Sequence, residues 1–321
     1  MSAPQVSVIV PVHNAAGHLE ALLASLAAQT QPGLEFLLVD DGSQDDSLAM
    51  LQAFAIQEPR ARVFHHPQAK GSAAARNTAI AAAQGEYLGF ADADDICMPA
   101  QYQRLFQLAQ DQRLDVAYCN AYCFGQQPGD STQLVCSKRK LDGVRQGRDW
   151  LIHGWQVGER VSATWLSLVR RELVIAGGLR FPDGEIMDDE LWTPSLMLRA
   201  ERVAWLPEPL YYYRNHLDSI TQTRQPEKVM RRLQSLCRVA DALFQLAALQ
   251  QGELALALRW HAYLNGDAAL GLLKRLPIKH GRREAYVSLR ESGVLDKLWR
   301  QAPTFRLAKR LLRESVIARF A

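Results

Sequence analysis

The first 120 residues alternate short apolar runs with longer amphipathic segments. Apolar, β-branched runs predict buried strands at residues 6–12, 35–39, 61–64, 86–91 and 114–118. Helices are predicted between them, at residues 15–29, 45–57, 72–83 and 99–110. Continuous apolar strands separated by helices are typical of a mainly parallel sheet that helices cover on both faces. The pattern therefore predicts an α/β fold, in which ligands bind beyond the carboxyl ends of the strands.

The pattern changes after residue 120. Residues 121–160 are less regular and predict loops or an insertion. Strands are predicted again at residues 162–169 and 201–213, on either side of a Gly- and Asp-rich stretch.

The C-terminal part of the chain is predicted to be largely helical. Helical spacing of apolar residues extends over 229–247 and 253–273. We therefore expect an N-terminal binding and catalytic domain, residues 1–225, and a helical C-terminal region, residues 226–321.

Composition excludes several classes of protein. The chain has 321 residues, 48 % of them hydrophobic and 22 % charged, which is typical of a globular protein with a sizeable core. No apolar run approaches the roughly 18 residues of a membrane span, and the first residues lack the basic start of a signal peptide. The five cysteines are irregularly spaced and predict reduced thiols. We expect a cytoplasmic protein.

The net charge of +3 hides an asymmetry between the two parts of the chain. Residues 271–321 contain 13 Lys+Arg and 4 Asp+Glu, which leaves 24 Lys+Arg and 30 Asp+Glu for the remainder. Near Leu307, Leu311 and Ile317 apolar positions fall at helical spacing, with basic residues between them. Such a helix either lies peripherally on an anionic inner-membrane surface or packs on its own domain. The sequence leaves both alternatives open.

Polar side chains follow the predicted strands at the point where each strand ends. They are His13 and Asn14 after the first strand, Asp40 and Asp41 after the second, and Asp92, Asp94 and Asp95 after the fourth. Neighbouring carboxylates repel one another, and a divalent cation such as Mg²⁺ or Mn²⁺ would offset that repulsion. Lys70, Arg76 and helix N-termini would add positive charge. The sequence therefore predicts a metal-assisted receptor for a diphosphate.

Several rival classes lack their motifs. The chain contains neither G-x-x-x-x-G-K-[ST] nor G-x-G-x-x-G, which argues against a P-loop NTPase and a dinucleotide oxidoreductase. Residues 11–17 do not supply the Gly-rich basic loop of a sugar-phosphate nucleotidyltransferase. No nucleic-acid-binding motif accompanies the basic tail, so we expect no nucleic-acid partner.

A family resemblance rests on six blocks in order. They are Val-Ser-Val-Ile-Val-Pro-Val-His-Asn at residues 6–14, Val-Asp-Asp-Gly-Ser at 39–43, the Ala-Arg-Asn block at 71–77, Phe-Ala-Asp-Ala-Asp-Asp-Ile-Cys-Met-Pro at 90–99, Arg-Phe-Pro-Asp-Gly-Glu-Ile-Met-Asp-Asp-Glu at 180–190, and Leu-Tyr-Tyr-Tyr-Arg-Asn-His-Leu-Asp-Ser-Ile-Thr at 210–221. In these blocks the chain resembles an inverting glycosyltransferase of family 2 with the GT-A fold, of the bacterial lipopolysaccharide or polysaccharide type. The resemblance covers about residues 5–225 and does not extend to the C-terminal third.

The resemblance implies a nucleotide-sugar site. Its donor-binding residues would be Pro11, His13, Asn14, Asp41, Lys70, Arg76, Asp92, Ala93, Arg214 and Ser219. His13 stands where the family usually has a tyrosine that stacks on the base, and Asp41 matches the carboxylate that contacts the base. Arg214 and Ser219 would belong to a lid over the diphosphate.

The resemblance also implies the metal ligands and the catalytic acids. Asp94 would hold Mn²⁺ or Mg²⁺, and His216 would complete the metal site. Asp189 would be the general base, with Asp188 beside it in place of the family's glutamate. The implied reaction moves a sugar from a nucleoside diphosphate, UDP by expectation, to a hydroxyl of a glycan or lipid-linked acceptor with inversion.

The residues also allow structural interpretations. Asp40 and Asp41 before Gly42 are typical of a turn, and acids at 94–95 and 188–190 favour the start of a helix. A non-catalytic nucleotide- or glycan-binding protein with a degenerate GT-A site is the alternative function.

Overall fold

The structure, a computed structural model, describes residues 3–125, 127–139, 141–216, 225–276, 281–291 and 293–300. By its internal contacts the chain divides into two compact units, Met1–Asn215 and His216–Ala321. The assignment of residues 1–225 to donor binding and catalysis, and of 226–321 to a separate helical region, stays a prediction.

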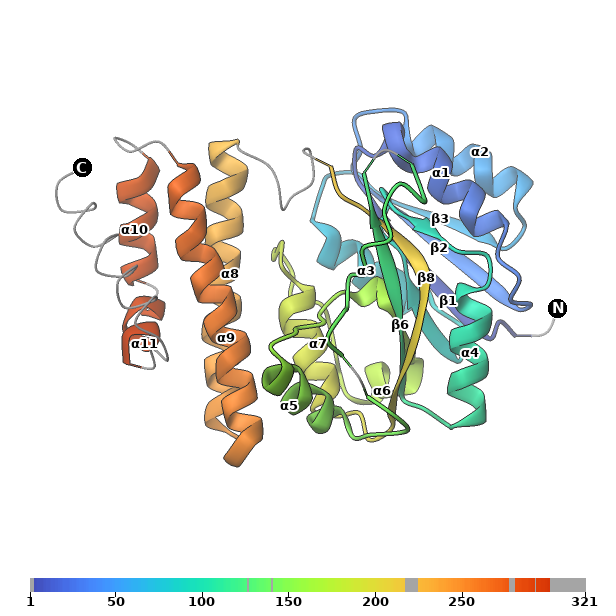
Figure 1. The fold of residues 1–321 in the computed structure, drawn as a ribbon. Coiled ribbons are helices and arrows are strands. Elements are labelled where there is room, and N and C mark those ends of the chain that lie inside the picture. The colour runs from blue at the N-terminus through green and yellow to red at the C-terminus, as the bar shows by residue number, and fades with distance from the viewer. Residues whose placement is uncertain are drawn as a thin grey trace. The chain divides into compact units, whose positions relative to one another are not determined.

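The first unit is built on a sheet whose described strands have the order β3-β2-β1-β4-β7-β6-β8-β5 (Figure 1). The strands are β1 (Val6–Val12), β2 (Leu34–Asp41), β3 (Ala61–His66), β4 (Tyr87–Phe90), β5 (Ile96–Cys97), β6 (Val116–Phe124), β7 (Ser167–Arg170) and β8 (Val203–Arg214). Strands β3, β2, β1 and β4 are parallel neighbours, and β6 is parallel to β8. The carboxyl ends of β1 to β4 therefore meet at one edge of the sheet.

Helices flank this sheet (Figure 1). They are α1 (Ala16–Ala27), α2 (Ser47–Gln57), α3 (Ser72–Ala82), α4 (Gln101–Asp111), α5 (Gly147–Val157), α6 (Arg171–Ala176) and α7 (Asp189–Met197). Strands β1 and β2 are apolar and almost wholly buried, because the helices cover both of their faces. The predicted α/β architecture is confirmed.

Two strands run against the predicted parallel order. β7 is antiparallel to both β4 and β6, and β5 is antiparallel to β8. β7 is also shorter than the strand predicted at residues 162–169, because Thr164–Leu166 forms a 3₁₀ turn. Trp165 in that turn stacks on Tyr211 and Tyr213, with ring centroids 4.6 and 5.3 Å away. The 3₁₀ turn, which packs its aromatic side chain against β8, stands in place of the first part of the predicted strand. The local pattern of apolar residues does not show this contact.

The turn after β2 requires a residue without a side chain. Gly42 has a φ of +67°, which is strained for residues with a Cβ. A Cβ on Gly42 would also lie 2.6 Å from the backbone nitrogen of Ala69, in the turn between β3 and α3. The two turns therefore approach each other backbone to backbone at the edge where the strands end.

The second unit contains the helices α8 (Pro226–Ala248), α9 (Gly252–Leu272), α10 (Gly281–Glu291) and α11 (Val294–Arg300). The predicted helices at 229–247 and 253–273 are confirmed as α8 and α9. α8 buries the apolar face formed by Val229, Leu233, Leu236, Val239 and Leu243. In the part of the chain that the structure describes, no helix combines the length and apolar character that a membrane crossing requires. The basic segment around Leu307 and Leu311 lies outside the described residues.

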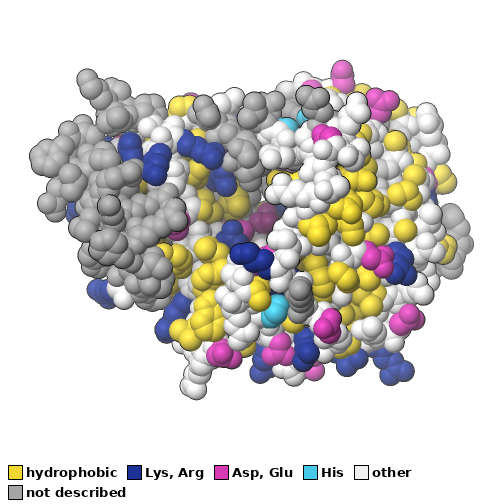
Figure 2. Space-filling view, viewed as in Figure 1, with side chains coloured by type: hydrophobic (Ala, Val, Ile, Leu, Met, Phe, Trp, Pro, Cys, Tyr) yellow, Lys and Arg dark blue, Asp and Glu magenta, His cyan; other side chains and the backbone are white. Residues whose placement is uncertain are grey.

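The face of the first unit seen in Figure 2 carries acidic and basic side chains that are dispersed among apolar and uncharged groups.

Gly42→Ala should disturb the strand-end turns beyond its effect on stability. Gly33 is the matched control, because its φ is +68° but a Cβ there would meet only the Gln5 side chain, at 3.3 Å. We expect Gly33→Ala to lower the unfolding free energy by about 1–2 kcal/mol, the usual penalty of the left-handed region, and to leave nucleotide binding unchanged. Gly42→Ala should lower stability more and weaken nucleoside diphosphate binding. Urea unfolding and a binding titration measure both, and equal effects of the two variants would contradict the close approach.

Candidate active site

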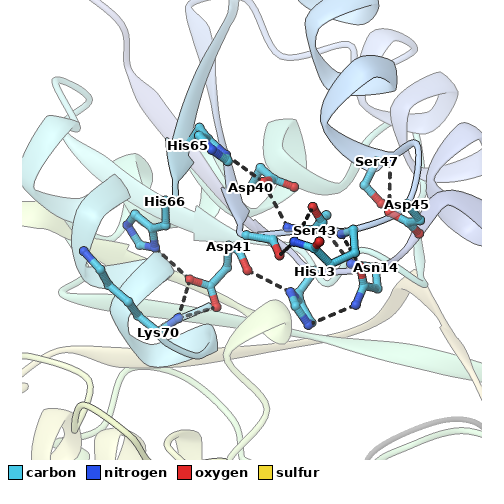
Figure 3. Close-up of polar contacts among 12 residues, drawn as sticks. His13, Asn14, Asp40, Asp41, Ser43, Asp45, Ser47, His65, His66 and Lys70 are labelled. Carbon is cyan, nitrogen blue, oxygen red and sulfur yellow. Dashed lines mark hydrogen bonds and ion pairs between the residues drawn. The ribbon is translucent and has the colours of Figure 1, made fainter. Parts of the chain in front are cut away.

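A network of polar contacts joins the carboxyl ends of β1, β2 and β3 (Figure 3). Nδ1 of His13 donates to the carbonyl oxygen of Asp41 at 2.7 Å. Asn14 accepts the Gln44 amide at Oδ1, so its Nδ2 is the donor to Nε2 of His13, at 3.1 Å. Both ring nitrogens of His13 are therefore used within the protein. The ring is nevertheless exposed, which leaves a planar face for stacking.

The carboxylate of Asp41 is fully engaged in this structure. Oδ1 accepts from Nδ1 of His66 at 2.7 Å and from the Lys70 amide at 2.9 Å. Oδ2 accepts from the Gly71 amide at 2.7 Å and from the same Lys70 amide at 3.1 Å. These four contacts fill the acceptor sites of a carboxylate. Asp41 thus fixes the turn that leads into α3 and exposes the Lys70 side chain (Figure 3).

Two histidines on β3 support the acids on β2, and the sequence analysis missed them. In the parallel register, Asp40 lies opposite His65 and Asp41 lies opposite His66. Nδ1 of His65 contacts Oδ2 of the fully buried Asp40 at 2.9 Å. The signal that could have identified them is the pair of polar residues that directly follows Val63 and Phe64 at the end of the strand.

Arg76 on α3 joins two distant segments of the chain. Its Nη2 donates to Oδ1 of Asp92 at 2.9 Å, and its Nη1 donates to Oδ2 of Asp188 at 2.6 Å. Arg76 is buried, and burial lowers its pKa, but Asp188 and Asp92 outweigh that effect and raise the pKa overall. The guanidinium therefore stays charged and holds the turn after β4 next to the start of α7.

Asn77, the next residue on α3, anchors the segment that leads to α7. Its Nδ2 donates to the carbonyl oxygen of Phe181 at 2.8 Å and to Asp183 at 3.1 Å, and its Oδ1 accepts the Phe181 amide. The sequence analysis used Asn77 only as part of a motif. The structure shows that consecutive residues of α3 hold both ends of the segment 181–188.

Asp188 and Asp189 lie in different environments. Asp188 is buried, and its carboxylate accepts from Arg76 and from the Asp189 amide, which caps α7. Asp189 is partly exposed at the first residue of α7. Burial, and then the charges of Glu190 and Asp188, raise the pKa of Asp189 well above its usual value, although Arg76 acts in the opposite direction. Asp189 is thus a partly exposed carboxyl whose surroundings disfavour its charged form, which makes its carboxylate a stronger base.

The turn after β4 gathers negative charge. Burial raises the pKa of Asp92, Arg76 lowers it, and Asp94 raises it again. The pKa of the buried Asp95 is raised well above its usual value, first by burial and then by Asp94 and Asp92. A divalent cation beside Asp94 would offset this repulsion, so the residues fit a metal.

The described residues do not form a complete metal cage. No group of three or more Asp, Glu, His or Cys side chains among them is arranged to hold a metal ion. A metal here would keep several positions for water or phosphate oxygens, as Mg²⁺ usually does.

The remaining predicted residues have the following positions. Pro11 is in β1, and Ala93 is in the turn between the two acids of the D-x-D motif. Arg214 ends β8, and its Nε donates to the carbonyl oxygen of Asp94 at 2.7 Å. His216 begins the second unit, and Ser219 lies outside the described residues. The structure brings together Asp92, Asp94 and Arg214, and Arg76 connects Asp188 to this group. The contacts of all these residues with a ligand stay predictions.

Solved structures define the class of fold. The chain is similar to residues 1–349 of S. aureus TarS, solved with UDP-GlcNAc, with a TM-score of 0.63 and 18 % identity over 94 % of this chain and 93 % of that one. It is also similar to the mannosyltransferase PcManGT of Pyrobaculum calidifontis, solved with GDP-Man and Mn²⁺, with a TM-score of 0.57 and 20 % identity over 98 % and 86 % of the two chains. The protein therefore has the GT-A fold with C-terminal helices.

Sequence relatives show the family. The profile described as glycosyl transferase family 2 matches residues 7–166. The glycosyltransferase GlyG of Streptococcus pneumoniae is 30 % identical over 226 residues, which cover 68 % of this chain and 73 % of GlyG. The "uncharacterized glycosyltransferase YibD" of Escherichia coli K12 is 34 % identical over 223 residues, 69 % of this chain and 64 % of that protein. The chain belongs to glycosyl transferase family 2, and it spans just under two thirds of YibD.

Removal of Arg76 should leave two acids without their counter-charge. We expect Arg76→Met to lower the unfolding free energy by about 3–5 kcal/mol, as is usual when one partner of a buried ion pair is lost. The control is Arg60→Met, because Arg60 pairs with Glu58 at 2.7 Å in a more exposed position, and such pairs contribute less than about 1 kcal/mol. Urea unfolding measures both variants. Similar losses of unfolding free energy in the two variants would show that the ion pairs of Arg76 contribute no more to stability than a more exposed pair.

The raised pKa of Asp189 predicts how stability depends on pH. A carboxylate whose folded pKa exceeds its unfolded value of about 3.9 destabilises the fold once it ionises, and this loss develops as the pH rises from that value to the folded pKa. We therefore expect Asp189→Asn to unfold at a higher temperature than the wild type at pH 7, and the difference to shrink near pH 4. Thermal unfolding across this range measures the effect. A variant less stable than the wild type at pH 7 would contradict the assigned pKa direction.

Proposed function

We propose that this protein transfers a sugar from a nucleoside diphosphate to an acceptor hydroxyl with inversion at the anomeric carbon. The observation that carries the proposal is the single guanidinium of Arg76, which bonds Asp92 in the D-x-D turn and Asp188 next to Asp189. One buried cation thus holds the predicted donor-binding acids beside the predicted base. TarS and PcManGT, which have the same fold, were solved with UDP-GlcNAc and with GDP-Man and Mn²⁺, and this supports a nucleotide-sugar donor.

The nucleoside would bind at the ends of β1 and β2. The exposed ring of His13 would stack on the base, and Pro11 and Asn14 would shape the pocket beside it. Asp41 would accept a hydrogen bond from a base N–H at Oδ2. It would then lose only the 3.1 Å bond from the Lys70 amide to that oxygen, so its other three bonds would keep the turn fixed. Asp92 and Ala93 would face the ribose.

The diphosphate would bind between the metal and the basic residues. Asp94 would hold Mn²⁺ or Mg²⁺, and the cation would supply positive charge to the departing diphosphate. Lys70 projects from the turn before α3 and would add a second positive charge, and Arg214 and Ser219 would cover the diphosphate. Arg76 would act on the same site indirectly, since its terminal nitrogens are committed to Asp92 and Asp188.

Asp189 would act as the general base. Its carboxylate would take the proton of the acceptor hydroxyl while that oxygen attacks the anomeric carbon from the side opposite the diphosphate. The bond from the anomeric carbon to the diphosphate oxygen breaks in the same step, so no covalent enzyme intermediate forms. The raised pKa strengthens Asp189 as a base, and Arg76 occupies the carboxylate of the neighbouring Asp188 through a hydrogen bond.

The acceptor would be a glycan or a lipid-linked glycan of bacterial polysaccharide synthesis. Relatives named for polysaccharide-type glycosyl transfer, such as the putative teichuronic acid glycosyltransferase TuaG of Bacillus subtilis, 39 % identical over 92 residues, support this class. The basic C-terminal segment would bring the enzyme to an anionic membrane surface from the cytoplasm. Retention of the full chain on anionic liposomes at moderate salt tests that location.

A nucleotide titration tests the proposal directly. We expect one of UDP, GDP, dTDP and CDP, with UDP first, to bind at least about ten-fold tighter when Mn²⁺ is present, about 1.4 kcal/mol. Asp94→Ala should lose the gain in nucleotide affinity that Mn²⁺ gives and keep the affinity measured without metal. Calorimetric titration measures each combination.

Two outcomes would overturn parts of the proposal. A folded protein that binds none of the four nucleotides would favour the alternative, a non-catalytic glycan-binding protein with a degenerate site. Full turnover by Asp189→Asn would contradict the assignment of the base while leaving the donor site in place.

A further inference from the structure

Asp95, the third acid of the turn after β4, has an unusual environment. It is fully buried, and its two carboxylate oxygens accept hydrogen bonds from β8. Oδ2 accepts the hydroxyl of Tyr211 at 2.9 Å, and Oδ1 accepts the backbone amide of Arg214 at 2.7 Å. Burial, and then the charges of Asp94 and Asp92, raise the pKa of Asp95, and the two hydrogen bonds act in the opposite direction. The bonds therefore offset part of the cost of burying this carboxyl group.

Tyr211 connects the two ends of that turn. Its hydroxyl donates its proton to Asp95 and accepts the backbone amide of Asp92 at 3.1 Å. Its ring stacks on Trp165 and is fully buried, which fixes the hydroxyl in place. The Tyr211 hydroxyl thus links Asp92 and Asp95, the first and the last residue of the turn, in addition to the backbone bond from the Asp95 amide to the carbonyl oxygen of Asp92 at 3.2 Å.

The end of β8 makes two further bonds to the same turn. Arg214 donates its amide to Asp95 and its Nε to the carbonyl oxygen of Asp94. The turn therefore has a support from β8 at Asp92, Asp94 and Asp95. The two oxygens of Asp95 face Tyr211 and Arg214, not the partly exposed side where Asp92 and Asp94 lie.

We propose that Tyr211 and Asp95 are positioning residues that hold the D-x-D backbone against β8, so that the side chains of Asp92 and Asp94 present one fixed geometry to the donor and its metal. Asp95 itself is not a metal ligand. The proposal rests on the proposed function only for the identity of the ligand, because the support of the turn is a property of the protein alone.

The first test measures the support without any ligand. Tyr211→Phe removes one hydroxyl and keeps the ring. Tyr87→Phe is the matched control: Tyr87 is equally buried, and its hydroxyl likewise donates once, to Leu114 at 2.9 Å, and accepts once, from Arg170 at 2.7 Å. We expect the Asp92 amide to exchange hydrogen for deuterium at least about ten-fold faster in Tyr211→Phe, and to be unchanged in Tyr87→Phe, since only the first variant removes its acceptor.

The second test measures the consequence for binding. With UDP and Mn²⁺ as probes, we expect Tyr211→Phe to lose at least about five-fold of the metal-dependent gain in affinity, while Tyr87→Phe keeps it. Asp95→Asn should lose a similar factor of the metal-dependent gain in affinity, since the single amide oxygen of asparagine can replace only one of the two carboxylate oxygens that accept hydrogen bonds. The double variant should lose little more than either single variant, because both act through the same bond.

The outcomes separate this proposal from the proposed function. Wild-type protein that shows no metal-dependent binding of UDP would refute UDP as the nucleotide of the proposed function, and the exchange rate of Asp92 would still decide whether Tyr211 supports the turn. Unchanged exchange at Asp92 in Tyr211→Phe would overturn the support. Faster exchange of the Asp92 amide together with wild-type affinity for UDP would overturn the role of Tyr211 in binding. Additive losses of affinity in the double variant would show that Tyr211 and Asp95 do not act through the same hydrogen bond.

Discussion

The buried guanidinium of Arg76 is the interaction on which the rest of the site depends. Three parts of the chain that are far apart in sequence, α3, the turn after β4 and the start of α7, meet at its two terminal nitrogens. A charge buried this deeply is stable only while its partners are in place, because either carboxylate alone would be left uncompensated. The protein therefore assembles its acids during folding and not when a ligand arrives. Such preorganisation is what electrostatic catalysis requires.

Acids of the same type take different roles because their surroundings differ. Asp188 and Asp189 are neighbours, yet Asp188 accepts from Arg76 and caps α7, whereas Asp189 carries the raised pKa. Asp94 and Asp95 show the same division, with Asp95 turned toward β8 and Asp94 partly exposed. The number of carboxylates in a motif therefore does not equal the number available to a ligand.

The strands and the polar residues at their ends could be predicted from the sequence, because a buried strand has a continuous apolar run and its polar end interrupts that run. Asn77 and Tyr211 could not be predicted in the same way, since their partners lie more than a hundred residues away. Arg76 was predicted to lie near the nucleotide on the evidence of one motif. Its bonds to Asp92 and Asp188 depend on the packing of three elements, which local patterns do not encode. The antiparallel β7 is a similar case, because strand direction follows from the path of the chain.

Arg76 and Asn77 hold the segment 181–188 against α3, so this helix positions both the predicted donor-binding acid Asp92 and the segment that leads to the proposed base. The amino end of this helix borders the predicted diphosphate site, and its first turns fix the approach to Asp189. If the proposed function holds, redesign of the loop before α3 to change the donor would also displace the proposed base, and turnover would fall even where binding improved. Loops attached to other elements would then be the better starting points for altering donor specificity.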